Sequence, residues 1–216
     1  MSRRAPLAAA IAIAIALASG CAHRAPPPAG TPAGPPPAPT AAELPQPDAL
    51  PPDFTVRQKL TATTAAHGGG SFEAVLQKQA GKLTLVGIAP YGSRAFALEQ
   101  QGGDVKLTNY TSREPPFPPN LVLLDVYRVF GAWLGPPPAA DGERDGVVRG
   151  ERIHERWRGG RLVERTFTRA DGNPPGAVTI AYTGADAAPG LAEDVTLQNA
   201  RYGYSLRIHT LATAPK

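Results

Sequence analysis

Residues 202–210 read YGYSLRIHT, and this stretch predicts the architecture of the chain. Large apolar side chains stand at every second position, at Tyr202, Tyr204, Leu206 and Ile208, with small or polar residues between them. Successive side chains of a β-strand point to opposite faces, so the pattern indicates a strand with one apolar wall and one solvated face. The rest of the chain must then supply the other strands of the sheet.

The same alternation begins at residues 54–62, where Phe54, Val56 and Leu60 fall on one side. Short turns such as Ala80-Gly81 separate the alternating segments, and such turns join antiparallel neighbours. We expect about ten strands in a meander. The other predicted strands are residues 71–79, 82–89, 94–100, 104–110, 147–157, 162–169, 177–183 and 194–199.

Residues 119–134 break this alternation and predict a helix of about four turns. Its apolar residues recur at helical spacing at Val122, Val126, Val129, Phe130 and Trp133, with Leu121 and Leu124 widening the stripe. The proline pair at its start and Gly135 with three following prolines at its end suit the termini of a helix. The predicted fold is mainly β (α+β): a curved antiparallel sheet or half-barrel around one inserted helix, with a cavity on its open side.

The first 20 residues predict a lipoprotein signal peptide. Arg3 and Arg4 precede an apolar run that ends in Ser19 and Gly20, directly before Cys21. The run is too short and too rich in alanine for a membrane span, which needs about 20 apolar residues. We expect cleavage before Cys21 and acylation of its thiol, for example with palmitate, so that the chain has a lipid anchor facing the periplasm.

Residues 21–52 are predicted to form a lipidated tether. From residue 25 onward they are dominated by proline, alanine and glycine without apolar periodicity. A proline-rich chain extends by about 3.1 Å per residue, so the tether could hold residues 53–212, the predicted folded domain, tens of ångströms from the anchor. A passive spacer is an equally good interpretation. Ala22 after the cysteine, in place of an aspartate, favours the outer membrane over the inner one.

Composition and motifs argue against several functions. Without Arg3 and Arg4, 20 lysines and arginines face 18 acidic residues, an excess too small to predict nucleic-acid binding. One cysteine and four histidines make no Cys-based zinc site. No Gly-x-Ser-x-Gly motif is present, and His154 and Glu155 should point to opposite faces of a strand as surface residues. An enzyme is therefore not expected.

Two further features concern the surface. The segment Ile-Ala-Pro-Tyr-Gly-Ser at residues 88–93 is an apolar hairpin tip, and apolar tips favour contact with lipid or a partner, although Tyr91 folding back over the sheet is nearly as good an explanation. Basic residues also crowd a strand pair. We expect them to pair with glutamates across strands rather than to bind anionic headgroups. They are Arg149, Arg152, Arg156, Arg158 and Arg161, beside Glu151, Glu155 and Glu164.

From residue 54 to residue 210 the chain resembles the outer-membrane lipoprotein receptor LolB and its periplasmic relative LolA. The resemblance rests on the order of strands, the Pro90-Tyr91-Gly92-Ser93 hairpin and the Trp133-Leu134-Gly135-Pro136 ending. The chain is similar to LolB-like lipoproteins encoded with aryl-polyene (xanthomonadin-type) pigment clusters, through GKLTLVG at residues 81–87 and NARYGY at residues 199–204.

The resemblance implies a half-barrel closed by helices, an acyl-binding cavity and no metal or redox cofactor. Tyr91 matches the apolar hairpin residue that helps LolB deliver cargo to the membrane, although tyrosine departs from the LolB pattern. The expected function is binding of an acyl or polyene chain on its way to the outer membrane, with a periplasmic carrier or exporter as further partner. The alternative is a non-catalytic envelope scaffold for a pigment-assembly or export complex. The residues expected to line the cavity are Phe130, Trp133, Leu134, Tyr204 and Leu206.

Overall fold

The computed structural model describes residues 36–64, 68–112, 117–188 and 191–214. The predicted leader, Cys21 and the first part of the predicted tether lie outside these residues. Within the described part of the chain, no helix has the length and apolar character needed to cross a membrane.

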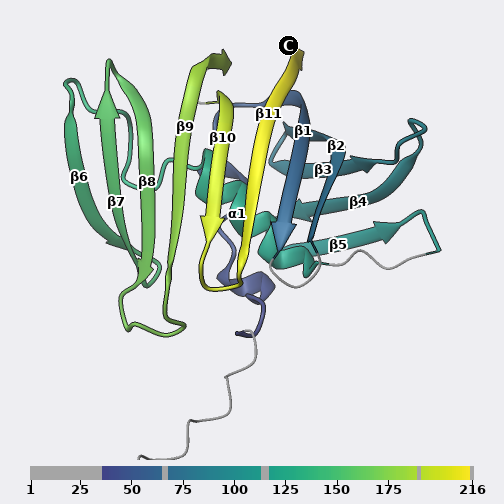
Figure 1. Ribbon diagram of the computed structural model, residues 1–216, viewed down its shortest axis with the longest axis horizontal. Helices are drawn as coiled ribbons and strands as arrows, with labels where there is room; N and C mark the ends of the chain where they lie inside the picture. The colour runs from purple at the N-terminus through teal and green to yellow at the C-terminus, as the bar shows by residue number, and fades with distance from the viewer. Residues whose placement is uncertain (1–35, 65–67, 113–116, 189–190, 215–216) are drawn as a thin grey trace, which may run out of the picture. The chain divides into compact units, whose positions relative to one another are not determined.

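One antiparallel sheet of 11 strands forms the framework, in the order β5-β4-β3-β2-β1-β11-β10-β9-β8-β7-β6 (Figure 1). Two meanders, β1 to β5 and β6 to β11, meet where the first and last strands pair. The strands are β1 (Phe54–Thr64), β2 (Gly68–Gln79), β3 (Lys82–Ile88), β4 (Arg94–Gln101), β5 (Asp104–Asn109), β6 (Gly142–Val148), β7 (Glu151–Arg158), β8 (Arg161–Arg169), β9 (Ala177–Ala188), β10 (Leu191–Asn199) and β11 (Tyr204–Ala214).

The predicted curved antiparallel sheet with one inserted helix is confirmed. The helix α1 (Pro119–Phe130) lies in the connection between β5 and β6, and Figure 1 shows it behind the central strands. Every second side chain of the central strands is buried, as at Val195, Leu197 and Ile208. These side chains pack with α1 into one apolar core on the inner face of the sheet.

Two predicted boundaries are wrong. The single strand predicted at residues 147–157 is two strands, because Arg149 (φ 53°) and Gly150 (φ 75°) form a turn in the left-handed region that joins β6 to β7. The helix predicted to reach Leu134 ends at Phe130. The chain leaves the helix at Gly131 with an extended conformation, in which a Cβ would lie 2.6 Å from the carbonyl oxygen of Tyr127, so only glycine fits there without a shift.

Residues 36–52, which we call the N-terminal strap, pack on the domain, although the sequence placed them in a tether unable to bury apolar surface. They contain two short 3-10 helices, Ala41–Glu43 and Pro47–Ala49. Leu44 and Leu50 belong to the core and are 1% and 4% exposed. Folded structure therefore begins before residue 53, because two leucines in an otherwise proline-rich segment suffice to dock it.

Candidate functional site on the inner face of the sheet

The helix α1 is fixed on the inner face by its apolar side and by its C-terminal carbonyl groups. Leu123 and Tyr127 are fully buried against the sheet. At the C-terminal end, Arg165 of β8 donates to the carbonyl oxygen of Arg128 at 2.8 Å, and Tyr182 of β9 donates to that of Val129 at 2.8 Å. Carbonyl groups in the last turn of a helix lack hydrogen-bond donors within the helix. Arg165 and Tyr182 supply these donors from the sheet.

The N-terminal strap is held through its backbone carbonyl groups. Arg149 donates to the carbonyl oxygen of Leu44 at 3.1 Å, and Lys78 donates to those of Leu50 and Pro51 at 3.2 and 2.9 Å. Gln100 of β4 is central to this arrangement. It donates to the carbonyl oxygen of Pro45 at 2.9 Å and accepts a hydrogen bond from Tyr127 at 2.8 Å, so it links strap, sheet and helix.

The predicted cavity residues near the end of the helix take three different places. Phe130 is buried in the core. Trp133 packs edge-on against Phe167, with ring centroids 5.1 Å apart, and donates to the carbonyl oxygen of Tyr127 at 2.7 Å. Leu134 packs on the backbone of Gly146. A Cβ added to Gly146 would lie only 2.6 Å from Cδ2 of Leu134.

The other two predicted cavity residues belong to β11. Tyr204 and Leu206 are partly buried against the core. Trp133 lines a hollow of about 180 Å³ together with Tyr127 and strap residues. Tyr204 lines a different and more open hollow of about 380 Å³ at the end of β1, β10 and β11. The structure thus places Trp133 and Tyr204 at separate hollows, while the strap leucines Leu44 and Leu50 are buried in the core.

A buried cluster of charged side chains, which the sequence analysis missed, connects the helix to the sheet. Arg201 forms two hydrogen bonds of 2.7 Å to the carboxylate of Glu151. Arg128 of the helix pairs with the same carboxylate at 3.1 Å and with Asp125 at 3.1 Å. The hydroxyl of Tyr204 donates to the other carboxylate oxygen of Asp125. Tyr204, which was predicted to line the cavity, therefore makes a polar contact with the helix in this structure.

Burial and charge act differently on the pKa values in this cluster. Burial raises the pKa of Asp125 despite the nearby Arg128, and it raises the pKa of Tyr204, with a further increase from the Asp125 charge. Tyr204 therefore stays protonated as a donor. For Glu151, burial opposes ionisation, but the hydrogen bonds and charges of Arg201 and Arg128 outweigh it and lower the pKa. Glu151 is thus the ionised partner of both guanidinium groups.

A second buried cluster centres on Glu155 of β7, which the sequence analysis placed on the surface. Its side chain is 0% exposed. Arg165 pairs with one carboxylate oxygen at 2.7 Å, while Arg144 at 2.6 Å and Trp157 at 3.1 Å contact the other. The predicted cross-strand pairing is confirmed on the outer side for Arg156 and Glu164, 2.6 Å apart. His154 and Glu155 do point to opposite faces, but only His154 is a surface residue.

The hairpin between β3 and β4 presents Tyr91 to solvent. Its side chain is 99% exposed, so it does not fold back over the sheet. The turn is closed by Ala89, whose amide donates to the carbonyl oxygen of Ser93 at 2.8 Å. A large aromatic side chain at a tip without a covering neighbour is suited to an interface.

The described residues thus form an open antiparallel sheet curved round one helix, with an apolar inner face and two buried ionic clusters. The sequence matches the family described as "Protein of unknown function (DUF3261)" over residues 55–212, and the chain belongs to this family. No curated protein matches the sequence.

Solved structures give low-similarity matches. A LolA superfamily protein from Nitrosomonas europaea has 12% identity and a TM-score of 0.47, covering 83% of this chain and 94% of its own. The lipoprotein LppX from Mycobacterium tuberculosis has 12% identity and a TM-score of 0.34, with 74% and 85% covered. A DUF1329 family protein from Desulfovibrio piger has 11% identity and a TM-score of 0.33, with 80% and 89% covered.

Proposed function

We propose that this chain is a lipid-anchored, non-catalytic envelope protein that binds an acyl or polyene chain on the inner face of its sheet and aids the transport of that chain to the outer membrane. The observation that carries the proposal is the way the N-terminal strap occupies this face. Leu44 and Leu50 are buried there, while the strap is attached mainly through backbone carbonyl groups. A lipid chain can replace the apolar surface of the two leucines, while water or a polar head group replaces the strap carbonyl groups as acceptors for Arg149, Lys78 and Gln100.

The free energy gained by burying a lipid chain is similar to that lost when the two leucines leave the core. Each buried methylene group contributes about 0.8 kcal/mol, so a long acyl chain can match the burial of two leucine side chains. The strap then acts as an internal competitor, because it must leave before the chain can enter. Selectivity rests on chain length rather than on polar contacts.

The anchor belongs to the same proposal. Cys21 carries the lipid, residues 21–35 are the remaining tether, and the domain faces the periplasm at the outer membrane. Tyr91 contacts the membrane during transfer. A periplasmic carrier or exporter supplies the cargo, and polyene lipids are the cargo that the resemblance to proteins of aryl-polyene gene clusters favours.

The test removes the competition by the strap. Leu44→Glu places a charge on the strap, which should release it from the core, while Ala42→Glu puts the same charge on an exposed strap position. We expect the Leu44 variant of the full chain to bind a dansyl-labelled fatty acid several-fold more tightly than the wild type, and the Ala42 variant to bind like the wild type. Circular dichroism establishes that both variants are folded. Absence of binding to the wild type and to both folded variants contradicts the proposal.

The filled interior favours one second function, a non-catalytic envelope scaffold for a pigment-assembly or export complex. In that case Leu44 and Leu50 are permanent core residues and no lipid exchanges with them. Native mass spectrometry of the protein purified from its own host separates the two functions, because a carrier retains a fraction of bound lipid and a scaffold retains a protein partner.

A further inference from the structure

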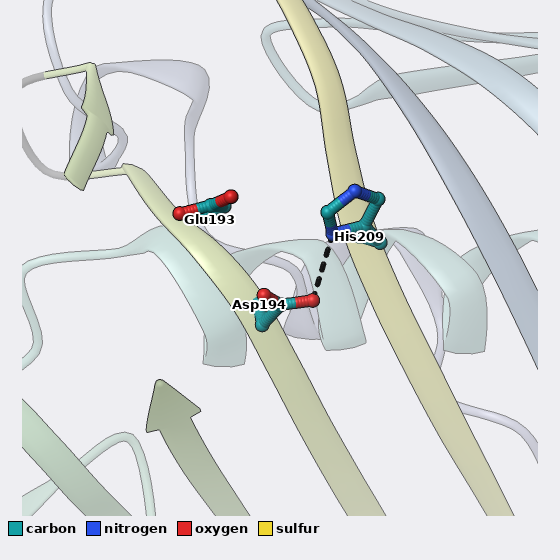
Figure 2. Close-up of side chains that lie close together, drawn as sticks. All are labelled: Glu193, Asp194 and His209. Carbon is teal, nitrogen blue, oxygen red and sulfur yellow. Dashed lines mark hydrogen bonds and ion pairs between the residues drawn. The ribbon is translucent and has the colours of Figure 1, made fainter. Parts of the chain in front are cut away.

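A group of polar side chains lies on the outer face of the central strands. Asp194 of β10 and His209 of β11 are direct register partners, and Nδ1 of His209 lies 2.8 Å from Oδ1 of Asp194 (Figure 2). Glu193 joins them, so that one ligand-type atom from each residue lies within 4.8 Å of the other two. The adjacent Val195 and Ile208 point into the core, which leaves Asp194 and His209 accessible from solvent.

A β-bulge in β9 lies opposite Glu193. Adjacent residues of a regular strand point to opposite faces, so Glu193 and Asp194 should diverge. Ala192 pairs with Asp186 and Asp194 pairs with Thr183, so two residues of β9 oppose the single residue Glu193. Such bulges recur beside functional sites, and ligand-type atoms of Glu193 and Asp194 do lie within 4.8 Å of each other here.

The glycine of the bulge leaves room for both carboxylates. Gly184 has φ +80°, and a Cβ there would lie 3.0 Å from Oε2 of Glu193 and 3.5 Å from Oδ2 of Asp194. The two carboxylate groups therefore converge on one position next to bare backbone. The amide of Ala185 contacts the same Glu193 oxygen at 3.4 Å. A larger residue at position 184 would separate the carboxylates from each other.

Two of the three residues in this group are carboxylates. In the part of the chain that the structure describes, neither Glu193 nor Asp194 forms an ion pair with a basic residue other than His209. Arg161, on β8, lies 3.9 Å from Asp186 instead. Lys59, the register partner of His209 on β1, is exposed. A divalent cation would neutralise the charge of the two carboxylates.

We propose that Glu193, Asp194 and His209 bind a divalent transition-metal ion, with Zn²⁺ as the best match. Carboxylate oxygen and imidazole nitrogen bind Zn²⁺ at about 2.0–2.2 Å, whereas Ca²⁺ and Mg²⁺ prefer all-oxygen sites. Three protein ligands leave one tetrahedral position for water or for a donor from another molecule. The ion would join β10 to β11 on the face opposite to the strap, so the site is independent of lipid binding.

Isothermal titration calorimetry of the full chain in detergent with ZnCl₂ tests the site. We expect one Zn²⁺ per chain, and at least about tenfold weaker binding in each of the variants Glu193→Gln, Asp194→Asn and His209→Asn. All three residues are partly exposed, so the variants should fold, and their thermal unfolding without metal checks this.

The matched control is His154→Asn. His154 also faces an aspartate, with Nδ1 2.9 Å from Asp145, but Glu143 is 4.0 Å away and no group of three ligand atoms forms there. We expect this variant to bind Zn²⁺ like the wild type. Equal losses in His154→Asn and His209→Asn would show adventitious binding to surface histidines and overturn the proposal. Absence of measurable binding to the wild type would overturn it as well.

Discussion

Glu155 lies between two guanidinium groups without access to solvent, so we expect its charge to be essential for stability. Glu155→Gln leaves Arg165 and Arg144 without a counter-charge. Breaking a buried pair in this way costs about 3–5 kcal/mol in the free energy of unfolding. The control is Glu164→Gln, which removes a pair that is about one third exposed and should cost less than about 1 kcal/mol. Urea unfolding measures both, and equal effects would contradict the buried role of Glu155.

Glu151 makes a pH-dependent contribution to stability. Its pKa is lower in the folded chain than the usual 4.5, so its stabilising effect is complete above that pH and is lost as the pH falls through the lowered pKa. Asp125 acts in the opposite sense, because its raised pKa favours the folded state at low pH. We expect Glu151→Gln to destabilise the protein by about 3–5 kcal/mol at neutral pH and by clearly less near pH 3. Urea unfolding at both pH values checks this, and a constant difference would contradict it.

The buried ion pairs of Glu151 and Glu155 could be predicted from the sequence only in part. Glu151 and Glu155 stand at every second position with the buried Ile153 and Trp157. The period-two pattern of a strand therefore already places both glutamates on the inner face. Because charged residues usually lie on the surface, the sequence analysis predicted ion pairs on the surface. This prediction is correct for Arg156 and Glu164. The partners Arg128 and Arg201 come from distant parts of the chain and could not be predicted without the fold.

At the scale of elements, the end of α1 has room only for glycine at position 131. A Cβ there would lie 2.6 Å from the carbonyl oxygen of Tyr127 and 3.2 Å from Nε1 of Trp133, two atoms that hydrogen-bond to each other. We expect Gly131→Ala to destabilise the protein by about 1–3 kcal/mol. Gly103→Ala is the control, because a Cβ at that position meets no atom within 4 Å. Thermal unfolding compares them, and an unchanged Gly131→Ala would show that the helix end can adapt.

The elements themselves were largely predictable from the pattern of apolar residues. The alternation of period two located most strands within a few residues, since each has one buried face. The predicted helix was too long because apolar residues continue at helical spacing to Trp133 and Leu134, whereas the chain becomes extended at Gly131. The strap was missed because two leucines among prolines carry no periodicity, although they dock into the core.

At the scale of the whole molecule, the anchor can be separated from the domain. We expect Cys21→Ser to abolish lipidation, because only the thiol can accept the diacylglycerol, and to release the domain as a soluble periplasmic species. Fractionation of cells with detection in the periplasmic and membrane fractions measures this. A variant that remains wholly membrane-bound would contradict the lipid anchor.

The last prediction concerns how the released domain meets a membrane. In the Cys21→Ser background, Tyr91→Glu should leave thermal stability unchanged, because the side chain is 99% exposed and can accept a charge without breaking a contact. It should weaken binding to anionic vesicles several-fold, since an aromatic ring that buries in the lipid interface is replaced by a charge repelled from it. Tyr110→Glu is the matched control, because Tyr110 is exposed as well but stacks with Arg94, whose Cζ lies 4.8 Å from the ring. Vesicle flotation distinguishes them. Equal losses in both variants would indicate a general charge effect, and unchanged binding of Tyr91→Glu would remove the hairpin tip from membrane contact.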